Sequence, residues 1–344
     1  MSLPQWLQTH RAKAIAVCLI VALGVGAGGL ALALSRNEAP RAPALRSKPS
    51  TAKPSSTSTP APAVRVRVRA PAPHSPLTGL PGRPAHRVIA VKVTNIGPEI
   101  AGTSRSNLTQ FGIGSADVVV EELVEGGLTR LIAMYQSTLP TRVGPVRSLR
   151  ATDSYVVLPV RGLLLSSGGS GLEVRALKTR HVDFRSGGVG YGHVSSRPSV
   201  YSVVVDTKSL RQPYSKVPDL LRFGKPPLSK AKTVPTFTVR FSSKTVRFTY
   251  HNGIYLRESD LAQVRFPAKN VLVLQTHVRS LFVDQHGAKV PEEVLAGSGK
   301  ATLYSRGRMI TGRWQKSSQS SPIKTTFAVP PGKTAIELMP ANQP

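Results

Sequence analysis

The distribution of apolar and polar positions divides the chain into three zones. Residues 14–34 form an uncharged apolar run, AIAVCLIVALGVGAGGLALAL, that is long enough to cross the hydrocarbon core of a bilayer. Residues 35–75 are rich in Pro, Ser, Thr, Ala and Arg, a composition that buries too little apolar surface to fold and is typical of a disordered linker. From residue 76 onward short apolar runs alternate with turn residues, so the folded part is predicted to begin there.

Residues 76–225 contain runs of different kinds, which predict a mixture of strands and helices. HRVIAVKVTN (86–95) and SVYSVVVDT (199–207) predict strands, whereas LEVRALK (172–178) predicts a helix. Glycine-rich stretches between these runs predict exposed loops. We therefore expect a mixed α/β N-terminal domain over this segment.

Residues 234–344 hold short alternating runs separated by turn signals, a pattern that predicts a β-rich C-terminal domain. Asn252-Gly253 lies between two such runs and predicts a tight hairpin turn. SLFVDQ (280–285) and TTFAVP (325–330) predict separate strands in the same segment. Together with the preceding segment, the fold class expected from the sequence is α+β.

Residues 116–136, ADVVVEELVEGGLTRLIAMYQ, form the most distinctive polar feature. Of the 17 acidic residues in the chain, several lie close together here, namely Asp117, Glu121, Glu122 and Glu125. Gly-Gly between the two apolar runs predicts a two-residue β-hairpin turn, because both glycines can adopt positive φ. That turn would pair Leu123 with Arg130 and would put Arg130 diagonal to Glu121 and Glu125 on one face of the hairpin.

A helix from Asp117 to Glu125 is the alternative assignment for the first half of this feature. It would also put Glu121 and Glu125 on one face, but three β-branched valines argue against it. The two glutamates are candidates for the paired carboxyls of a glycan hydrolase, which lie about 5 to 9.5 Å apart. In a strand their backbones would be about 13 Å apart, so ion pairs with the nearby arginines are the simpler interpretation.

TRVGPVRSLR (141–150) follows the hairpin and contains a Gly-Pro turn among arginines. Backbone amides of this turn, with Arg147, Ser148 and Arg150, could bind a phosphate or a carboxylate. The same arginines could equally neutralise the acidic hairpin, and the sequence leaves both interpretations open. The candidate ligand-binding residues are thus Glu121, Glu122, Glu125, Arg130, Arg147, Ser148 and Arg150.

The N-terminal apolar run predicts that the folded part lies outside the cytoplasm. Residues 1–13 are expected to form a cytoplasmic tail, and residues 14–34 a single transmembrane helix or signal anchor. Ala31-Leu32-Ala33 could instead serve as the cleavage site of a signal peptide, so a retained anchor and a cleaved signal both stay open.

Charge and cysteine content narrow the expected partners. The 46 Lys and Arg residues against 17 Asp and Glu residues give a net charge of +29, which indicates an anionic partner. An extracytoplasmic location favours the membrane surface, an anionic wall polymer or an envelope protein, and argues against nucleic acid. The single cysteine, Cys18, lies in the apolar run, so no disulfide or thiol nucleophile is expected in the folded part. No sequence pattern indicates a metal or another cofactor.

The order of motifs from residue 76 to the C-terminus resembles the YerB-like lipoproteins, a family of bacterial envelope proteins without an assigned function. The motifs are PLTGLP, ADVVVEELVEGGLTRLIAMYQ, VGPVRSLR, the Gly-Gly-Ser loop, PSVYS, NVLVLQ, GSGKATLYSRGRMITGRWQK and PPGKTAIELMP. The resemblance implies a two-domain extracytoplasmic protein whose characteristic polar positions are Glu121, Glu122, Glu125, Arg130, Arg147 and Arg150.

This chain departs from the family pattern in two places. It lacks a usable lipid-attachment cysteine, so a transmembrane helix would replace the lipid. Leu164, Leu165 and Ser166 stand where the family has an aromatic residue, Val and His. We expect a membrane-anchored, non-enzymatic envelope protein that binds an anionic wall component or an envelope partner, with a cell-wall glycan hydrolase using Glu121 or Glu125 as the alternative.

Overall fold

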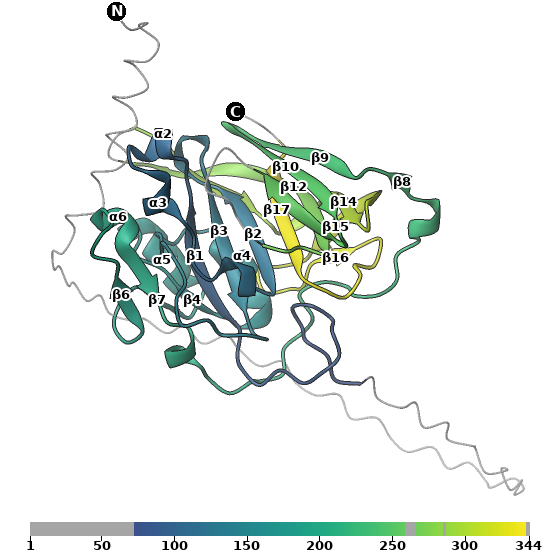
Figure 1. Cartoon of the computed structure of the whole chain (residues 1–344), viewed down its shortest axis with the longest axis horizontal. Helices are drawn as coiled ribbons and strands as arrows, with labels where there is room; N and C mark the ends of the chain where they lie inside the picture. The colour runs from purple at the N-terminus through teal and green to yellow at the C-terminus, as the bar shows by residue number, and fades with distance from the viewer. Residues whose placement is uncertain (1–71, 259–265, 285–286, 342–344) are drawn as a thin grey trace, which may run out of the picture. The chain divides into compact units, whose positions relative to one another are not determined.

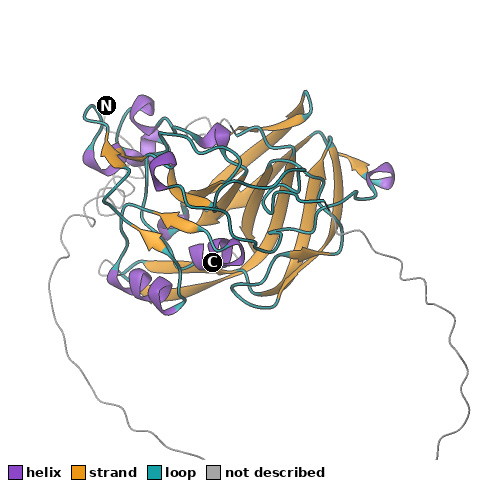
Figure 2. Cartoon of the chain, turned by 90° about the horizontal axis from the view of Figure 1, so that it is seen from below, coloured by secondary structure: helices purple, strands orange, loops and turns teal. Residues whose placement is uncertain are grey.

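The computed structural model describes residues 72–258, 266–284 and 287–341 (Figure 1). The predicted transmembrane run and residues 35–71 of the predicted linker lie outside these residues, whereas residues 72–75 are described and Ser75 is already buried. Within the described ranges, no helix is both long and apolar enough to cross a bilayer. The described part is a mixed α/β structure in which strands predominate and helices are short (Figure 2).

The helices flank the sheets and rarely exceed two turns. The α-helices are α2 (Pro98–Ala101), α3 (Arg105–Leu108), α4 (Asp153–Val157), α5 (Gly171–Thr179) and α6 (Ser199–Ser202). The 3-10 helices are η2 (Ile113–Ser115), η3 (Glu125–Gly127), η4 (Leu158–Val160), η5 (Lys208–Leu210) and η6 (Leu228–Lys230). Helix α5 confirms the helix predicted from LEVRALK. Ser170 begins it with a capping box in which the Ser170 side chain and Glu173 each bond the other's backbone amide.

The strands form a 12-stranded sheet with the order β16-β15-β14-β12-β17-β2-β3-β1-β4-β5, in which β13 also pairs with β12 and β8 with β15. Its first members along the chain are β1 (Ile89–Asn95), β2 (Val118–Leu123), β3 (Thr129–Tyr135), β4 (Leu163–Leu165), β5 (Phe184–Arg185) and β8 (Lys232–Thr233). The others are β12 (Asn270–Val283), β13 (Lys289–Val294), β14 (Gly297–Ser305), β15 (Arg308–Lys316), β16 (Lys324–Thr325) and β17 (Thr334–Pro340).

Two smaller sheets complete the described part. One is the antiparallel sheet of β9 (Thr236–Phe241), β10 (Lys244–His251) and β11 (Ile254–Glu258), and the other pairs β6 (Tyr191–His193) with β7 (Val203–Val205). The turn between β10 and β11 confirms the prediction from Asn252-Gly253, since both residues have positive φ, 49° and 85°.

Strand β17 connects the two halves of the sequence within one sheet. It runs parallel to β12 on one side and parallel to β2 on the other, so the C-terminal strand lies beside the acidic hairpin (Figure 1). Strands β1 and β2 are buried along their whole length, which is expected for strands covered on both faces.

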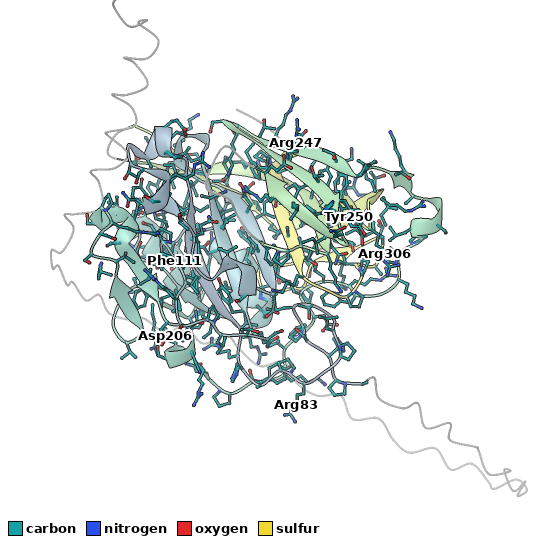
Figure 3. The ribbon with its side chains drawn as sticks, viewed as in Figure 1. Arg83, Phe111, Asp206, Arg247, Tyr250 and Arg306 are labelled. Atoms are coloured by element: carbon teal, nitrogen blue, oxygen red, sulfur yellow. The ribbon has the colours of Figure 1, made fainter. Side chains whose placement is uncertain are left out.

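Each face of the large sheet has its own apolar core. On one face, side chains such as Val119, Leu131 and Val271 pack against the three-stranded sheet through Phe237 and Phe248. On the other face, Val120, Ile132 and Leu272 pack against α4, α5 and the segments that carry Leu220 and Ile323. The side chains in Figure 3 show how densely the strands are covered, with Tyr250 on β10 and Arg247 on the same strand.

Several predicted strands differ from the observed elements. SVYS begins as helix α6, because Pro198 precedes it and fits the start of a helix, and only Val203–Val205 is a strand. SLFVDQ is not separate, since its first residues continue β12 to Val283. Of TTFAVP, only Thr325 is extended in a ladder. Strand β13 was not predicted, because KVPEEV carries a proline and two glutamates in place of apolar residues.

Candidate functional site

The acidic segment is the hairpin β2–β3, but its register differs from the prediction by one residue. Glu122 lies opposite Arg130, and Leu123 lies opposite Thr129. Residues 125–127 form a three-residue loop closed by the bond from Val124 N to Leu128 O, instead of a two-residue turn. A slip of one residue moves every side chain to the other face of a strand, so the predicted grouping of Glu121, Glu125 and Arg130 on one face was wrong.

Glu121 faces the three-stranded sheet and is fully buried there. Its Oε1 accepts from Thr129 Oγ1 (2.7 Å), from Asn95 Nδ2 (2.8 Å) and from Lys244 Nζ (3.0 Å). Its Oε2 pairs with the guanidinium of Arg257. Both cations therefore come from β10 and β11, far along the sequence from the hairpin.

The turn glycines help to place Lys244. Ser243 Oγ donates to Gly127 O at 2.5 Å, and a Cβ at Gly127 would lie 3.0 Å from Ser243 Oγ. The β9–β10 turn thus rests on the hairpin loop, and the next residue is Lys244. Glycine at this position allows both the positive φ of 72° and the close approach.

Glu121 and Glu337 are neighbouring buried carboxyls whose pKa values shift in opposite directions. Burial alone raises the pKa of Glu121, but Arg257, Lys244 and the Thr129 hydroxyl outweigh it and lower the pKa to about 2. Glu337, opposite Glu121 on β17, has a pKa well above its usual range because of burial and the Glu121 charge, and it is hydrogen-bonded to Glu121. Burial, with the nearby charge of Arg257, lowers the pKa of Lys244 to about 8, although Glu121 acts against both.

Glu122 points to the opposite face of the sheet, where Lys92 bridges it to Asp153. All three side chains are fully buried. Burial and the Asp153 charge raise the pKa of Glu122 to about 8, although Lys92 acts against them. Lys92 neutralises Asp153, and the Glu122 carboxyl, with its raised pKa, holds a proton at neutral pH.

Glu293 adds a further acid to this face. It comes from β13, where its Oε2 accepts from Leu123 N (2.8 Å) and its Oε1 accepts from Thr276 Oγ1 (3.2 Å). Burial raises its pKa well above the usual range, and Glu122 contributes to this shift. These contacts hold the β12–β13 hairpin against the C-terminal end of β2.

Beyond the end of β2, three arginines gather around two glutamates. Arg150 is buried and pairs through Nη2 with Glu125 Oε2 (2.5 Å) and through Nε with Glu173 Oε1 (3.0 Å). Arg147 donates to Val200 O at 2.5 Å, and its guanidinium lies 5.3 Å from the centroid of the Tyr201 ring. We call Arg130, Arg147, Arg150, Glu125 and Glu173 the arginine cluster.

Arg130 is the member of the cluster whose charge is least satisfied. Its Nη1 donates to the Ser148 carbonyl at 3.0 Å, and no carboxylate of the described residues forms an ion pair with it. Burial, Arg150 and Arg147 lower the pKa of Arg130 to about 9, so it remains charged at neutral pH. Because it is partly accessible to solvent, an anion could approach it.

The two carboxylates of the arginine cluster, Glu125 and Glu173, both form ion pairs with Arg150. Arg150 and Arg130 outweigh the effect of burial and lower the pKa of Glu125. Burial raises the pKa of Glu173, which also closes the capping box of α5. Glu121 and Glu125 thus lie in different ion-pair groups, and each is held as an anion, so neither has the raised pKa of a general acid.

Five backbone amides in and after the Gly-Pro turn are bonded within the protein, which leaves less of the backbone for a ligand than one interpretation of the sequence predicted. The amides of Gly144 and Val146 bond to the carbonyls of Phe111 and Val203. Those of Arg147, Leu149 and Arg150 bond to Lys92 O, Gly168 O and Asp153 Oδ2. The turn therefore contributes mainly its arginine side chains to the candidate site.

The loop after β4 lies against the same turn. Ser167 N donates to Arg147 O, and Leu149 N donates to Gly168 O. A Cβ at Gly169 would lie 2.7 Å from Leu149 Cδ1, so only glycine allows this approach. The Gly-Gly-Ser loop therefore fixes the position of the arginine turn and then begins helix α5.

Sequence reasoning missed the residues that neutralise the hairpin acids. The cations are Lys92, Lys244 and Arg257, and the missed carboxyls that share these groups of charges are Asp153, Glu173, Glu293 and Glu337. A signal for some of them was present, because Lys92 and Glu337 are single charges inside strands that are otherwise apolar. Such a residue is expected to have a buried partner.

This fold is shared by a known family of proteins. The chain is a member of the DUF3048 family of proteins of unknown function, whose N-terminal domain matches residues 77–218 and whose C-terminal domain matches residues 236–336. It is similar to the Bacillus subtilis (strain 168) protein described as "Putative lipoprotein YerB", with 27% identity over 259 residues, 67% of this chain and 77% of the relative.

The crystal structure of the YerB protein from Bacillus subtilis has the same fold. The two structures superpose with a TM-score of 0.62 and 22% sequence identity, over 77% of this chain and 96% of that chain. The expected resemblance to the YerB-like family is therefore confirmed.

Proposed function

We propose that this chain is a membrane-associated extracytoplasmic protein that binds an anionic group of an envelope component at the arginine cluster, with Arg130 as the main contact. The observation that carries the proposal is the charge imbalance there. Arg150 uses both glutamates, whereas Arg130 is charged, partly exposed and bonded only to a carbonyl among the described side-chain contacts. A phosphate or carboxylate would supply the missing counter-charge.

The location rests on two observations. The relative in Bacillus subtilis is described as a lipoprotein, and residues 14–34 of this chain form an apolar run of membrane-spanning length. We propose that this run anchors the chain in place of a lipid, and that residues 35–75 are a linker that holds the folded part away from the membrane.

Sedimentation of the full chain with purified cell-wall sacculi tests the binding. Arg130→Gln should weaken binding by about tenfold to a hundredfold, because a charge-assisted hydrogen bond contributes about 1.5 to 3 kcal/mol. Arg105→Gln, which removes an exposed arginine from α3, should change binding by less than about twofold.

Arg130→Lys distinguishes a binding role from a folding role. Lysine keeps the charge but loses the planar pair of donors, so binding should fall while the melting temperature stays close to that of the wild type. Equal binding of the wild type and Arg130→Gln, or binding that does not weaken at high salt, would overturn the proposal.

A further inference from the structure

A hollow in the outer part of the large sheet lies apart from the arginine cluster. It has a volume of about 380 Å³ and is lined by Ser298, Arg313, Trp314, Gln315, Lys324, Thr325 and Thr326. These residues come from β14, β15, β16 and the residue after β16. We call this the β15 hollow. Its lining contains two cations, two threonines and a serine, and it contains no acidic residue.

The strand register adds a third cation, Lys300, on the same face of the sheet beside the two that line this hollow. Lys300 of β14 lies directly opposite Arg313 of β15. Lys324 of β16 lies opposite Gln315, two residues along β15 from Arg313 and therefore on the same face. All three cations are exposed, and no described carboxylate forms an ion pair with any of them.

Like charges directly across a ladder destabilise a sheet. Lys300 and Arg313 form such a pair, and no ion pair with an acid of the described residues relieves the repulsion between them. An anion bound between them would relieve it. This differs from Glu121 and Glu122 in the buried hairpin, each of which has a cation beside it.

The floor of the hollow is rigid. Trp314 is 2% exposed and donates from Nε1 to Gln275 O at 2.8 Å. A Cβ at Gly312 would lie 2.1 Å from Thr326 Oγ1, so glycine is needed for the chain after β16 to approach β15. Thr326 Oγ1 accepts from Arg313 N at 3.1 Å, and Arg313 Nη2 donates to Ser298 Oγ at 3.2 Å, which orients the guanidinium over the hollow.

We propose that the β15 hollow is a second anion-binding site, and that its ligand is a polymer with repeated phosphodiester groups. The cations lie on successive strands, which are spaced by about 4.8 Å, so a chain that crosses the strands meets a cation on each. Arginine with nearby hydroxyl groups suits phosphate oxygens, which accept several hydrogen bonds.

An anionic membrane surface fits the hollow less well than a polymer does. Membrane-surface sites combine cations with exposed large apolar side chains, whereas the only aromatic residue lining the hollow, Trp314, is buried. The proposal does not depend on the arginine cluster, because it rests on different residues at other strands of the sheet.

Binding of the full chain, kept in a non-ionic detergent, to soluble poly(glycerol phosphate) tests the proposal. The variant Lys300→Gln/Arg313→Gln/Lys324→Gln should bind at least tenfold more weakly at about 0.15 M salt, since several contacts to one chain act together. The control Lys208→Gln/Arg240→Gln/Arg247→Gln removes the same charge from exposed positions elsewhere and should stay within about twofold of the wild type. Figure 3 labels Arg247 on the three-stranded sheet.

Three other outcomes would overturn the proposal. Equal losses in both triple variants would mean that net charge alone drives binding. Tighter binding to poly-glutamate, or to vesicles with anionic lipid, would assign the hollow to a different ligand. A loss confined to Arg130→Gln would place the polymer at the arginine cluster and leave the proposed function standing, whereas a loss confined to the hollow variant would support the second site. Melting temperatures of all variants should agree within a few degrees.

Discussion

Replacing Glu121 by Gln tests whether the buried ion pairs on this face hold the small sheet against the large one. The change takes the Glu121 carboxylate away from Lys244 and Arg257, whose side-chain exposures are only 6% and 5%. Removing one partner of a buried ion pair costs about 3 to 5 kcal/mol, because the remaining charge stays buried. The pKa gives a similar magnitude. A carboxyl at about 2 in place of its ordinary 4.5 is stabilised by about 3 kcal/mol.

The pH dependence gives a second, independent measure of the same interaction. The folded-state pKa of Glu121 lies below the unfolded value, so its contribution is fully present above pH 4.5 and is lost as the pH falls toward 2. Wild-type stability should therefore fall over this range, and the fall should be smaller in Glu121→Gln.

Urea unfolding of the full chain, followed by circular dichroism, measures both effects. Glu99→Gln is the matched control, because Glu99 is exposed on α2 and its loss should change the free energy of unfolding by less than about 0.5 kcal/mol. The double variant Glu121→Gln/Lys244→Met should recover part of the loss by removing one uncompensated cation. A cost below about 1 kcal/mol for Glu121→Gln, or an unchanged acid limb, would refute the reasoning.

Three further changes test other parts of the structure. Glu293 takes up a proton on folding, so stability should decline as the pH rises above 4.5, and Glu293→Gln should reduce that decline in urea titrations at pH 5 and 8. Lys316 Nζ donates to three carbonyls of residues 318, 319 and 321, so Lys316→Met should increase hydrogen exchange in this loop but not in α5. Gly312→Ala should cost about 1 to 3 kcal/mol because its Cβ meets Thr326 Oγ1, whereas Gly171→Ala, which meets nothing within 4 Å, should not destabilise in thermal melts.

Local patterns predicted much of the strand content. The run IAVKVTN became β1, and the alternating runs after residue 234 became β9, β10 and β11. These predictions succeeded because alternation and turn residues act over a few positions. Strand β13 was missed because tertiary packing decides its conformation, through the contacts of Glu293 with Leu123 and Thr276.

The hairpin register shows a limit of the same reasoning. Gly126 and Gly127 do adopt positive φ, 69° and 72°, as predicted. The loop nevertheless includes Glu125, so it has three residues instead of two. Glycine pairs fit both loop lengths, and the choice depends on which face the flanking side chains must bury. That information lies in β9, β10 and β17, which pack around the hairpin.

The partners of the hairpin acids could not be predicted from the sequence for a related reason. Glu121 contacts Lys244 and Arg257 across 123 and 136 positions of sequence. The nearby arginines, which sequence proximity favoured, serve a different group of charges beyond the end of β2. Among the described ion pairs of the hairpin acids, the pair between Glu125 and Arg150 is the one that involves a nearby arginine.

The position of a charge relative to the sheet, and not its neighbours in sequence, therefore separates structural from functional candidates. Glu121 and Glu122 lie next to each other in the chain, yet they enter opposite cores and are compensated there by separate sets of residues. A buried carboxylate that is neutralised in this way is a poor binding site. A ligand that displaced its protein partner would leave a charge without compensation in an apolar core. Arg130, Lys300 and Arg313 lie at accessible positions where an anion can enter without displacing a protein carboxylate, and binding is expected at such positions.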